Sequence, residues 1–218
     1  MKNKNIIKTI SYTSLFWLFM LGSVLGFMLE GIWCVFRKGR WENHSATVWG
    51  PFCIIYGIGT IVVYLLAGFL ETKPPLLQFF CYMLAGGLVE YVASVFQELS
   101  FGSVSWDYSS HVMNLGGRVS LKMSLIWGFL GLAFTHFMFQ PLQSFFAGIS
   151  STGNTVICVV LTGFMAINLL ITSAALLRWG KRIAGVPPKT RVDEWMDQWY
   201  VNSKMEKIYC NMRFVKDT

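Results

Sequence analysis

Residues 123–177 read MSLIWGFLGLAFTHFMFQPLQSFFAGISSTGNTVICVVLTGFMAINLLITSAALL and contain no Asp, Glu, Lys or Arg. About 18 consecutive apolar residues are enough to predict one membrane-spanning helix, so this run predicts two. Turn-forming residues cluster near its centre, where residues 148–154 read GISSTGN. We therefore expect one helix over about 123–146 and another over about 155–177.

Three more apolar segments precede this run. Residues 9–29 and 45–70 are uncharged, and the second segment opens with Trp49-Gly50-Pro51, where proline suits a first helical turn. The third segment begins after Lys73-Pro74-Pro75 and continues to about Gln97, with Glu90 as its one charge. The fold class predicted is an all-α polytopic membrane protein with about five transmembrane helices.

Composition supports this class and excludes others. The chain is 54% hydrophobic and only 13% charged, whereas soluble domains are about 25% charged. We find no Walker A sequence, no dinucleotide fingerprint and no Ser-His-Asp or Cys-His signature, so nothing in the chain identifies it as an enzyme or lets it use ATP alone. We expect no cofactor and no nucleic-acid partner.

Metal binding is not predicted either. The cysteines form no C-x-x-C pair, and the histidines show no metal-ligand spacing, so neither a zinc site nor a disulfide framework is expected. The residues concerned are Cys34, Cys53, Cys81, Cys158, Cys210, His44, His111 and His136.

Basic residues suggest the orientation of the chain in the cell membrane. Five spans put the termini on opposite sides, and a cytoplasmic C-terminus places fourteen of the 18 basic residues inside, as the positive-inside rule prefers. Lys2, Lys4 and Lys8 argue against this orientation because they precede the first span. A sixth or re-entrant segment is the main alternative to five spans.

The first four spans resemble two parallel hairpin repeats, about 10–71 and 74–147, with 155–177 as an extra helix in a transmembrane domain over 1–177. Each half has a Gly-x-x-x-Glu helix, a polar loop and a helix that opens near Trp-Gly. The first half contains Gly26, Glu30, Trp41, Asn43 and Trp49-Gly50, and the second contains Gly86, Glu90, Trp106, Asn114 and Trp127-Gly128. Two-helix units that repeat in one orientation imply an axis along the membrane normal.

After residue 177 the composition changes sharply. Residues 178–218 hold nine basic and five acidic residues, and apolar side chains recur there at helical spacing. These are Val192, Trp195, Met196 and Trp199. We expect a cytoplasmic amphipathic helix on the anionic inner leaflet, and docking to a soluble partner explains the pattern equally well.

Glu30 and Glu90 are the strongest candidates for a functional site. An ionised side chain in hydrocarbon costs roughly 2.5–3.5 kcal/mol, so such a residue normally faces a partner, a cavity or a substrate path. Each follows a glycine by four residues, which allows another group to approach the carboxylate. Structural ion pairing or polar packing explains the two acids equally well.

The loops complete the candidate site. Arg118 follows Gly116 and Gly117 and could bind an anion such as a phosphate headgroup, or pair with Asp107 or Glu90. The predicted substrate or ion pathway comprises Glu30, Glu90, Asn43, Trp106, Asp107, Asn114 and Arg118.

These motifs resemble the CmpB family of type IV ABC-transporter membrane proteins over residues 10–147. The most specific part is Trp106-Asp-Tyr-Ser109 followed by Asn114-x-x-Gly117-Arg118; Trp49-Gly50-Pro51 and Tyr56-Gly57-x-Gly59 also fit. In that family the first loop usually reads Asn-Arg-Gly, whereas this chain has Asn43-His44-Ser45, unless Arg40 serves instead. The resemblance implies a bacterial inner-membrane permease subunit that needs a separate ATPase.

Three functions are therefore compatible with the sequence. The first is a permease-like subunit of an ABC-type transporter. The second is a membrane-embedded enzyme that acts on lipid headgroups at the cytoplasmic interface, and the third is a non-catalytic scaffold or regulatory subunit. Membrane lipids are expected partners in each, and self-association stays open.

Overall fold

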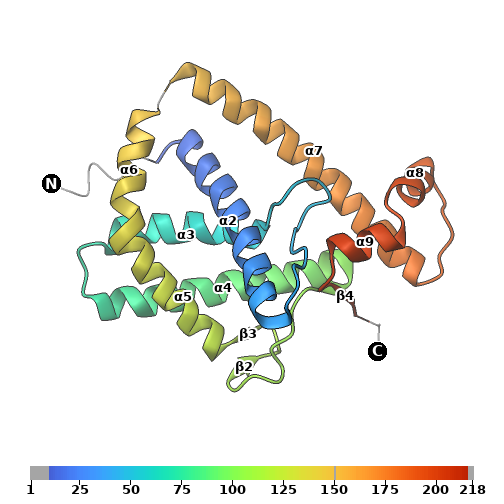
Figure 1. The fold of residues 1–218 in the computed structure, drawn as a ribbon, viewed down its shortest axis with the longest axis horizontal. Coiled ribbons are helices and arrows are strands. Elements are labelled where there is room, and N and C mark those ends of the chain that lie inside the picture. Colours follow the sequence, from blue (N-terminus) through green and yellow to red (C-terminus); the bar gives the residue numbers. More distant parts are fainter. Residues whose placement is uncertain (1–9, 150, 216–218) are drawn as a thin grey trace.

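The computed structural model describes residues 10–149 and 151–215, and Lys2, Lys4 and Lys8 lie outside these described residues. The chain is mainly helical (Figure 1), which confirms the predicted fold class. Its helices are α2 (Tyr12–Lys38), α3 (Ile54–Leu70), α4 (Pro75–Phe101), α5 (Leu121–Ala133), the π-helical segment η1 (Phe134–Met138), α6 (Phe139–Gly148), α7 (Thr152–Ile183), α8 (Arg191–Trp199) and α9 (Asn202–Ile208). Two short antiparallel pairs join β1 (Ser103–Val104) to β4 (Arg213–Phe214) and β2 (Asn114–Leu115) to β3 (Val119–Ser120).

Four helical segments are long and apolar enough to cross a membrane: α2, α4, the continuous run from α5 to α6, and α7. The α3 helix is apolar but has only 17 residues, or about 25 Å, against a hydrocarbon core of about 30 Å. The predicted break between two helices is confirmed, because α6 ends at Gly148 and α7 begins at Thr152 with a Ser151 cap. The predicted turn at 148–154 is too long at its end, since residues 152–154 already belong to α7. Five crossings remain a prediction.

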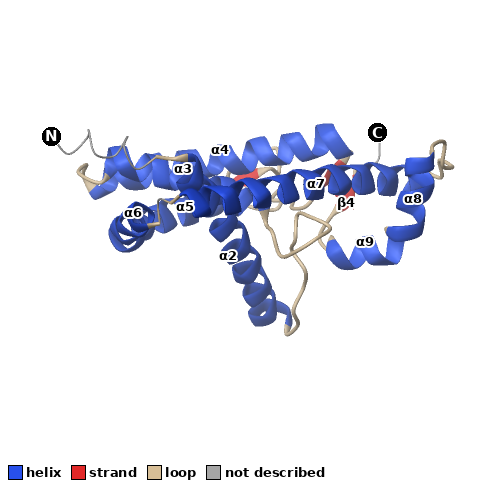
Figure 2. Ribbon diagram, turned by 90° about the horizontal axis from the view of Figure 1, so that it is seen from above, coloured by secondary structure: helices blue, strands red, loops and turns tan. Residues whose placement is uncertain are grey.

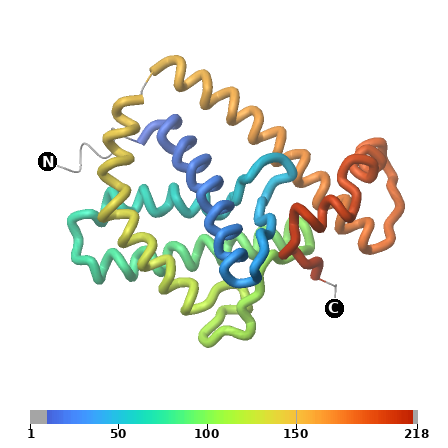
Figure 3. Tube along the Cα trace, in the orientation of Figure 1, coloured from blue at the N-terminus to red at the C-terminus, as the bar shows by residue number. Residues whose placement is uncertain are grey.

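The prediction that a helix begins at about Ser45 is wrong. The α3 helix begins only at Ile54, and Trp49-Gly50-Pro51 lies in the preceding loop, where Gly50 has a left-handed φ of 82°. That loop passes between α2 and α7 (Figure 3), and Asn168 of α7 binds both the backbone N–H and the carbonyl of Trp49. Non-helical backbone is tolerated beside lipid only where protein satisfies its polar groups, as the Asn168 amide does here.

Glycines set the packing within the two hairpins α2–α3 and α4–α5. In the first, Gly26 faces the Tyr56 ring, Gly22 faces Thr60 and Gly57 faces Phe19. In the second, Gly86 faces the Trp127 ring, Gly131 faces Tyr82 and Gly128 faces Phe79. Trp49-Gly50 precedes α3, whereas Trp127-Gly128 lies inside α5, so these two dipeptides do not occupy equivalent places.

The C-terminal segment packs on its own chain. The α7 helix continues to Ile183, six residues past its predicted end, and α8 and α9 lie beside that end of it (Figure 2). Trp179 of α7 is buried in one apolar core with four residues of the tail, namely Met196, Tyr200, Met205 and Tyr209. Of the predicted amphipathic stripe, Met196 is in this core, whereas Val192, Trp195 and Trp199 are exposed.

A buried arginine fastens this segment to α7. Arg178 is only 3% exposed, and its guanidinium donates to both oxygens of Asp197 at 2.8 and 2.7 Å. These bonds hold the pKa of the Asp197 carboxyl below its ordinary value of 3.8. A depressed pKa in the folded state means that the bridge stabilises docking above about pH 4, and that this stability is lost as the pH falls through the lowered pKa.

Asp197→Asn is therefore expected to weaken docking of the tail by about 1–2 kcal/mol, because Asp197 is partly exposed and solvent screens the pair. Trypsin should then cut faster at Lys189 and Arg191, which are exposed where α7 joins α8. Glu194→Gln, on the exposed side of α8, is the matched control and should leave the cleavage rate unchanged. Equal rates for Asp197→Asn and the unmodified chain would contradict this prediction.

Candidate functional site

Glu30 lies in the second half of α2 and has a partner on α3. The Tyr56 hydroxyl donates to Glu30 Oε1 at 2.5 Å. The Tyr56 ring can reach this position because it packs directly on Gly26, where an added Cβ would lie 2.2 Å from Tyr56 Cγ. The glycine one turn before Glu30 thus makes room for the aromatic ring that binds its carboxylate.

Glu90 lies near the middle of α4, and its surroundings repeat this arrangement with a different ring. Trp127 of α5 packs on Gly86, one turn before Glu90, which brings its indole near the Glu90 carboxylate. Glu90 is only 6% exposed, and its Oε2 has no hydrogen-bond partner among residues 10–149 and 151–215. An unsatisfied buried polar atom costs about 1–3 kcal/mol. Six other side-chain atoms of the described residues are also buried without a partner, but Glu90 is the only carboxylate among these residues.

The two carboxylates belong to one cluster. The rings of Tyr56 and Trp127 lie 6.2 Å apart, centroid to centroid, and Glu30 and Glu90 are close enough to interact electrostatically. Tyr108, in the loop after α4, also reaches this cluster. Burial raises the pKa of its hydroxyl, and the nearby charges of Glu90 and Glu30 raise that pKa further.

The loop residues predicted for the site hold Tyr108 in place rather than contact the carboxylates. The Tyr108 N–H donates to the Gly117 carbonyl at 2.7 Å, and the Trp106 indole donates to the Arg118 carbonyl at 2.9 Å. Asn114 closes the turn, since its Oδ1 accepts from the Gly117 N–H at 2.9 Å and its Nδ2 donates to two carbonyls. Trp106 and Asn114 are therefore positioning residues.

Arg118 pairs with a different acid from those expected. Its guanidinium donates to Ser94 at 3.1 Å and forms an ion pair with Glu98 at 2.6 Å, one and two turns beyond Glu90 on α4. Asp107 instead accepts from the Ser109 N–H at 2.9 Å, which lowers the pKa of its carboxyl. Ser94 and Glu98 of α4 thus anchor the loop that carries Tyr108 and Arg118.

Asn43 lies apart from these groups. Its Oδ1 accepts from the Ser45 N–H at 2.8 Å, and its carbonyl oxygen accepts from the Cys210 thiol at 3.0 Å. It therefore belongs to the contact between the first loop and the C-terminal segment.

Sequence reasoning identified both carboxylates but not the aromatic residues around them. Tyr56 and Trp127 were visible as the two aromatic-Gly dipeptides of the second helix in each hairpin, and Tyr108 lies inside the Trp106–Ser109 motif. A glycine four residues before a membrane acid, opposite such a dipeptide, is the signal that would have found them.

Chemically, the cluster presents two carboxylates between aromatic faces. Carboxylates accept hydrogen bonds and bind cations, and the rings of Tyr56 and Trp127 can attract a cation through their faces. The cluster is thus suited to a cationic or hydrogen-bond-donating group, or to a proton shared between the two acids.

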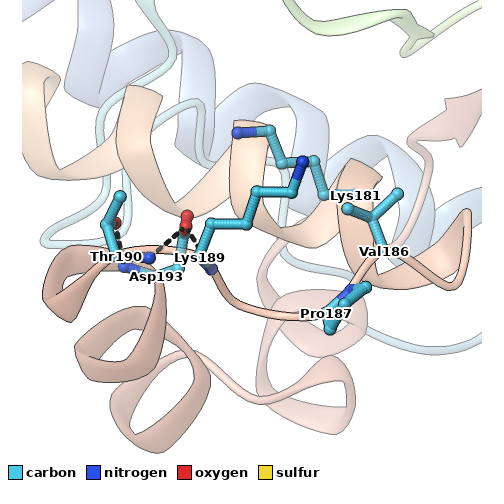
Figure 4. A pocket seen from close by; sticks show the side chains of 6 residues that line it. All are labelled: Lys181, Val186, Pro187, Lys189, Thr190 and Asp193. Atoms are coloured by element: carbon cyan, nitrogen blue, oxygen red, sulfur yellow. Dashed lines mark hydrogen bonds between the residues drawn. The ribbon is translucent and has the colours of Figure 1, made fainter.

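A shallow pocket elsewhere has a structural explanation (Figure 4). It lies where α7 joins α8 and is lined by Lys181, Val186, Pro187, Lys189, Thr190 and Asp193. Asp193 and Thr190 form a capping box there, with the Lys189 and Thr190 N–H groups both donating to Asp193 Oδ2 at 3.1 Å. The pocket follows from helix capping and holds none of the candidate site residues.

Tyr56→Phe is expected to lower the free energy of unfolding by about 1–2 kcal/mol, because it removes the hydrogen bond to Glu30 and keeps the ring on Gly26. The measurement is thermal unfolding in detergent for Tyr56→Phe, Glu30→Gln and the double variant. The two single effects should not add, since both changes break the same bond. Additive effects would show that the two side chains are not coupled.

The sequence was compared with protein families, curated proteins and solved structures. No curated protein and no solved structure matches it. The sequence model of one family, ABC_trans_CmpB, matches residues 17–173, and that family is described as "Putative ABC-transporter type IV". Because this match covers more than half of a chain with several membrane-length apolar helices, the protein is a multi-pass membrane protein that belongs to the CmpB family of ABC-transporter type IV components.

Proposed function

We propose that this chain is the permease-like membrane subunit of an ABC-type transporter, that a separate chain supplies the ATPase, and that Glu30 and Glu90 line the path of the substrate or ion. The observation that carries the proposal is the buried Glu90 carboxylate, which has an oxygen without a partner and lies beside a second acid. Intramembrane acids that are not fully satisfied by the protein are typical of transport pathways. Trp106, Asp107, Asn114 and Arg118 would shape the loop at the mouth of this path.

The two hairpins would be parallel repeats in this proposal. The contacts in the two hairpins support this proposal. Residues that make matching contacts in the first and second hairpins are separated by a constant difference in residue number, one value for α2 and α4 and another for α3 and α5. The difference is 60 from Gly26 and Glu30 to Gly86 and Glu90, and 71 from Tyr56 to Trp127. Two carboxylates at matching places about one axis would then face a common path between the hairpins.

The orientation proposed is an outer N-terminal end of α2 and a cytoplasmic C-terminus in the bacterial inner membrane. In support, the loops 39–53 and 102–120 contact the C-terminal segment: β1 pairs with β4, and His44 forms a backbone bridge with Tyr209. These segments carry most of the basic residues, which the cytoplasmic side retains. They would also be the surface that a soluble ATPase contacts.

The test is purification of the tagged chain from its native membranes in mild detergent, with the copurifying proteins identified by mass spectrometry. We expect an ATP-binding subunit whose ATPase activity rises when the full-length chain is present. Glu30→Gln and Glu90→Gln should abolish this rise without preventing assembly. No ATP-binding partner, together with no transport defect in a deletion strain, would overturn the proposal.

A lipid profile of the same deletion strain separates transport from the alternatives. A changed lipid headgroup composition, with turnover by the purified chain alone, would favour a membrane enzyme. Loss of function on removal of residues 178–218, with Glu30→Gln and Glu90→Gln both fully active, would favour a scaffold.

A further inference from the structure

A second cluster of reactive side chains lies away from the carboxylates, where α2, the first loop and the C-terminal segment meet. Cys34 Sγ lies 3.1 Å from His44 Nε2 and 3.8 Å from Glu42 Oε2, and these two atoms lie 4.0 Å from each other. The three side chains offer one ligand atom each within a space that fits a metal ion. Cys34 is 5% exposed, so the cluster has a buried floor.

A candidate for the fourth ligand lies near the other end of the chain. Cys210 follows α9, and its thiol donates to the carbonyl oxygen of Asn43, the residue between Glu42 and His44. Cys210 lies outside the group of three ligand atoms that are all within 4.8 Å of one another, so its side chain must turn toward Cys34 to complete a site. If Cys210 turns toward this group, two sulfurs, one imidazole nitrogen and one carboxylate oxygen meet, from residues that are up to 176 positions apart in the sequence.

The spacing matches tetrahedral coordination. Zinc binds sulfur at about 2.3 Å, nitrogen at about 2.0–2.1 Å and oxygen at about 2.0–2.2 Å, so the edges of a tetrahedral site measure about 3.4–3.8 Å. The three separations between Cys34, Glu42 and His44 lie within about half an ångström of these values. Only small movements of these three side chains are needed to admit an ion, together with a rotation of Cys210 toward them.

The residues around the three ligands affect the charge of the site and the orientation of His44. Two thiolates and one carboxylate exceed the charge of a divalent ion by one. Lys38 Nζ lies 2.6 Å from Glu42 Oε2, the proposed ligand atom, and must move aside when the ion binds, whereas Arg40 pairs with Oε1 at 3.0 Å and can stay. The side-chain amide of Asn211 lies 3.4 Å from His44 Nδ1. The near atom is the donor Nδ2, so the amide of Asn211 must turn by 180° to accept the Nδ1 proton and leave Nε2 free as a ligand, the usual outer-sphere arrangement of a metal-binding histidine.

We propose that Cys34, His44 and Cys210, with Glu42 as the fourth ligand, form a tetrahedral site for a zinc-like divalent cation that fastens the C-terminal segment to α2 and the first loop. Both thiols release their protons when the ion binds, because the thiolate is the ligand. The site is independent of the carboxylate pathway and of the transport proposal. The sequence alone predicts no such site, since its ligands follow no recognisable spacing.

The test is a cobalt titration of the full-length chain in detergent, after full reduction of its thiols and removal of metal by a chelator. Cobalt bound to thiolate gives a near-ultraviolet charge-transfer band, and its d–d absorption reports tetrahedral geometry. We expect about one Co²⁺ per chain, displaced by Zn²⁺. Cys34→Ser, His44→Gln and Cys210→Ser should each weaken binding at least about tenfold.

Cys81→Ser is the matched control, because Cys81 lies near the start of α4, far from the cluster, and this variant should bind like the unmodified chain. A second readout uses Cys210, which is exposed: Zn²⁺ should slow its alkylation in the unmodified chain but not in His44→Gln. The cobalt titration of the unmodified chain can decide the question without any substitution. Absence of the thiolate band in it, or equal binding by Cys34→Ser and Cys81→Ser, would overturn the proposal.

Discussion

Gly86→Ala is expected to lower the free energy of unfolding by about 3 kcal/mol or more, the largest stability loss of any single methyl group that we predict for this chain. A Cβ at position 86 would lie 2.1 Å from Trp127 Cγ and 2.4 Å from Trp127 Cβ. Rotation of the indole cannot relieve a clash with its own Cβ, so α4 and α5 must move apart. That movement also separates the Trp127 indole from Glu90.

Gly163→Ala is the matched control for this prediction. Gly163 lies within α7, and a Cβ there would meet nothing within 4 Å. The same substitution should raise stability there by about 0.5–1 kcal/mol, because alanine favours the helix over glycine. Thermal unfolding in one detergent compares the two variants directly. If both change the unfolding temperature alike, close packing on Trp127 is not what requires glycine at position 86.

The helices were largely predictable from sequence because hydropathy depends on residue type alone. Residues 123–177 gave two helical runs and the turn between them, and Pro75 marked the first turn of α4. The start of α3 was not predictable in this way. Residues 45–53 of the loop before it are uncharged and mostly apolar, and their backbone is non-helical where partners such as Asn168, far along the sequence, bind it.

The two acids of the candidate site could be predicted from the sequence, but the side chains around them could not. A carboxylate inside an apolar run is visible in any sequence, so Glu30 and Glu90 stood out. Which ring lies against which glycine depends on the register between two helices, and sequence does not specify it. The same limit hid the pairing of Arg118 with Glu98, and it hid the cluster of Cys34, Glu42 and His44.

Glu90→Met is expected to raise stability while it abolishes function. Methionine has a similar length, fills the same buried space and has no oxygen that lacks a partner, so we expect a gain of about 1–3 kcal/mol in the free energy of unfolding. If Glu90 lies on the transport path, the same change removes the group that binds the substrate or ion. Function is measured as stimulation of the partner ATPase or as rescue of a deletion strain, and stability by thermal unfolding of the purified chain.

Asn168→Leu is the control variant with which the stability of Glu90→Met is compared. Asn168 is also buried, but its amide donates to the Trp49 carbonyl at 2.7 Å and accepts from the Trp49 N–H at 3.3 Å. Leucine there leaves two backbone groups unpaired and should therefore destabilise the chain. Replacing a buried polar residue whose hydrogen bonds hold the fold together should lower the free energy of unfolding. Replacing one that is present for function should raise it. If Glu90→Met destabilises the chain as Asn168→Leu does and function survives, then Glu90 is a structural residue and the transport path lies elsewhere.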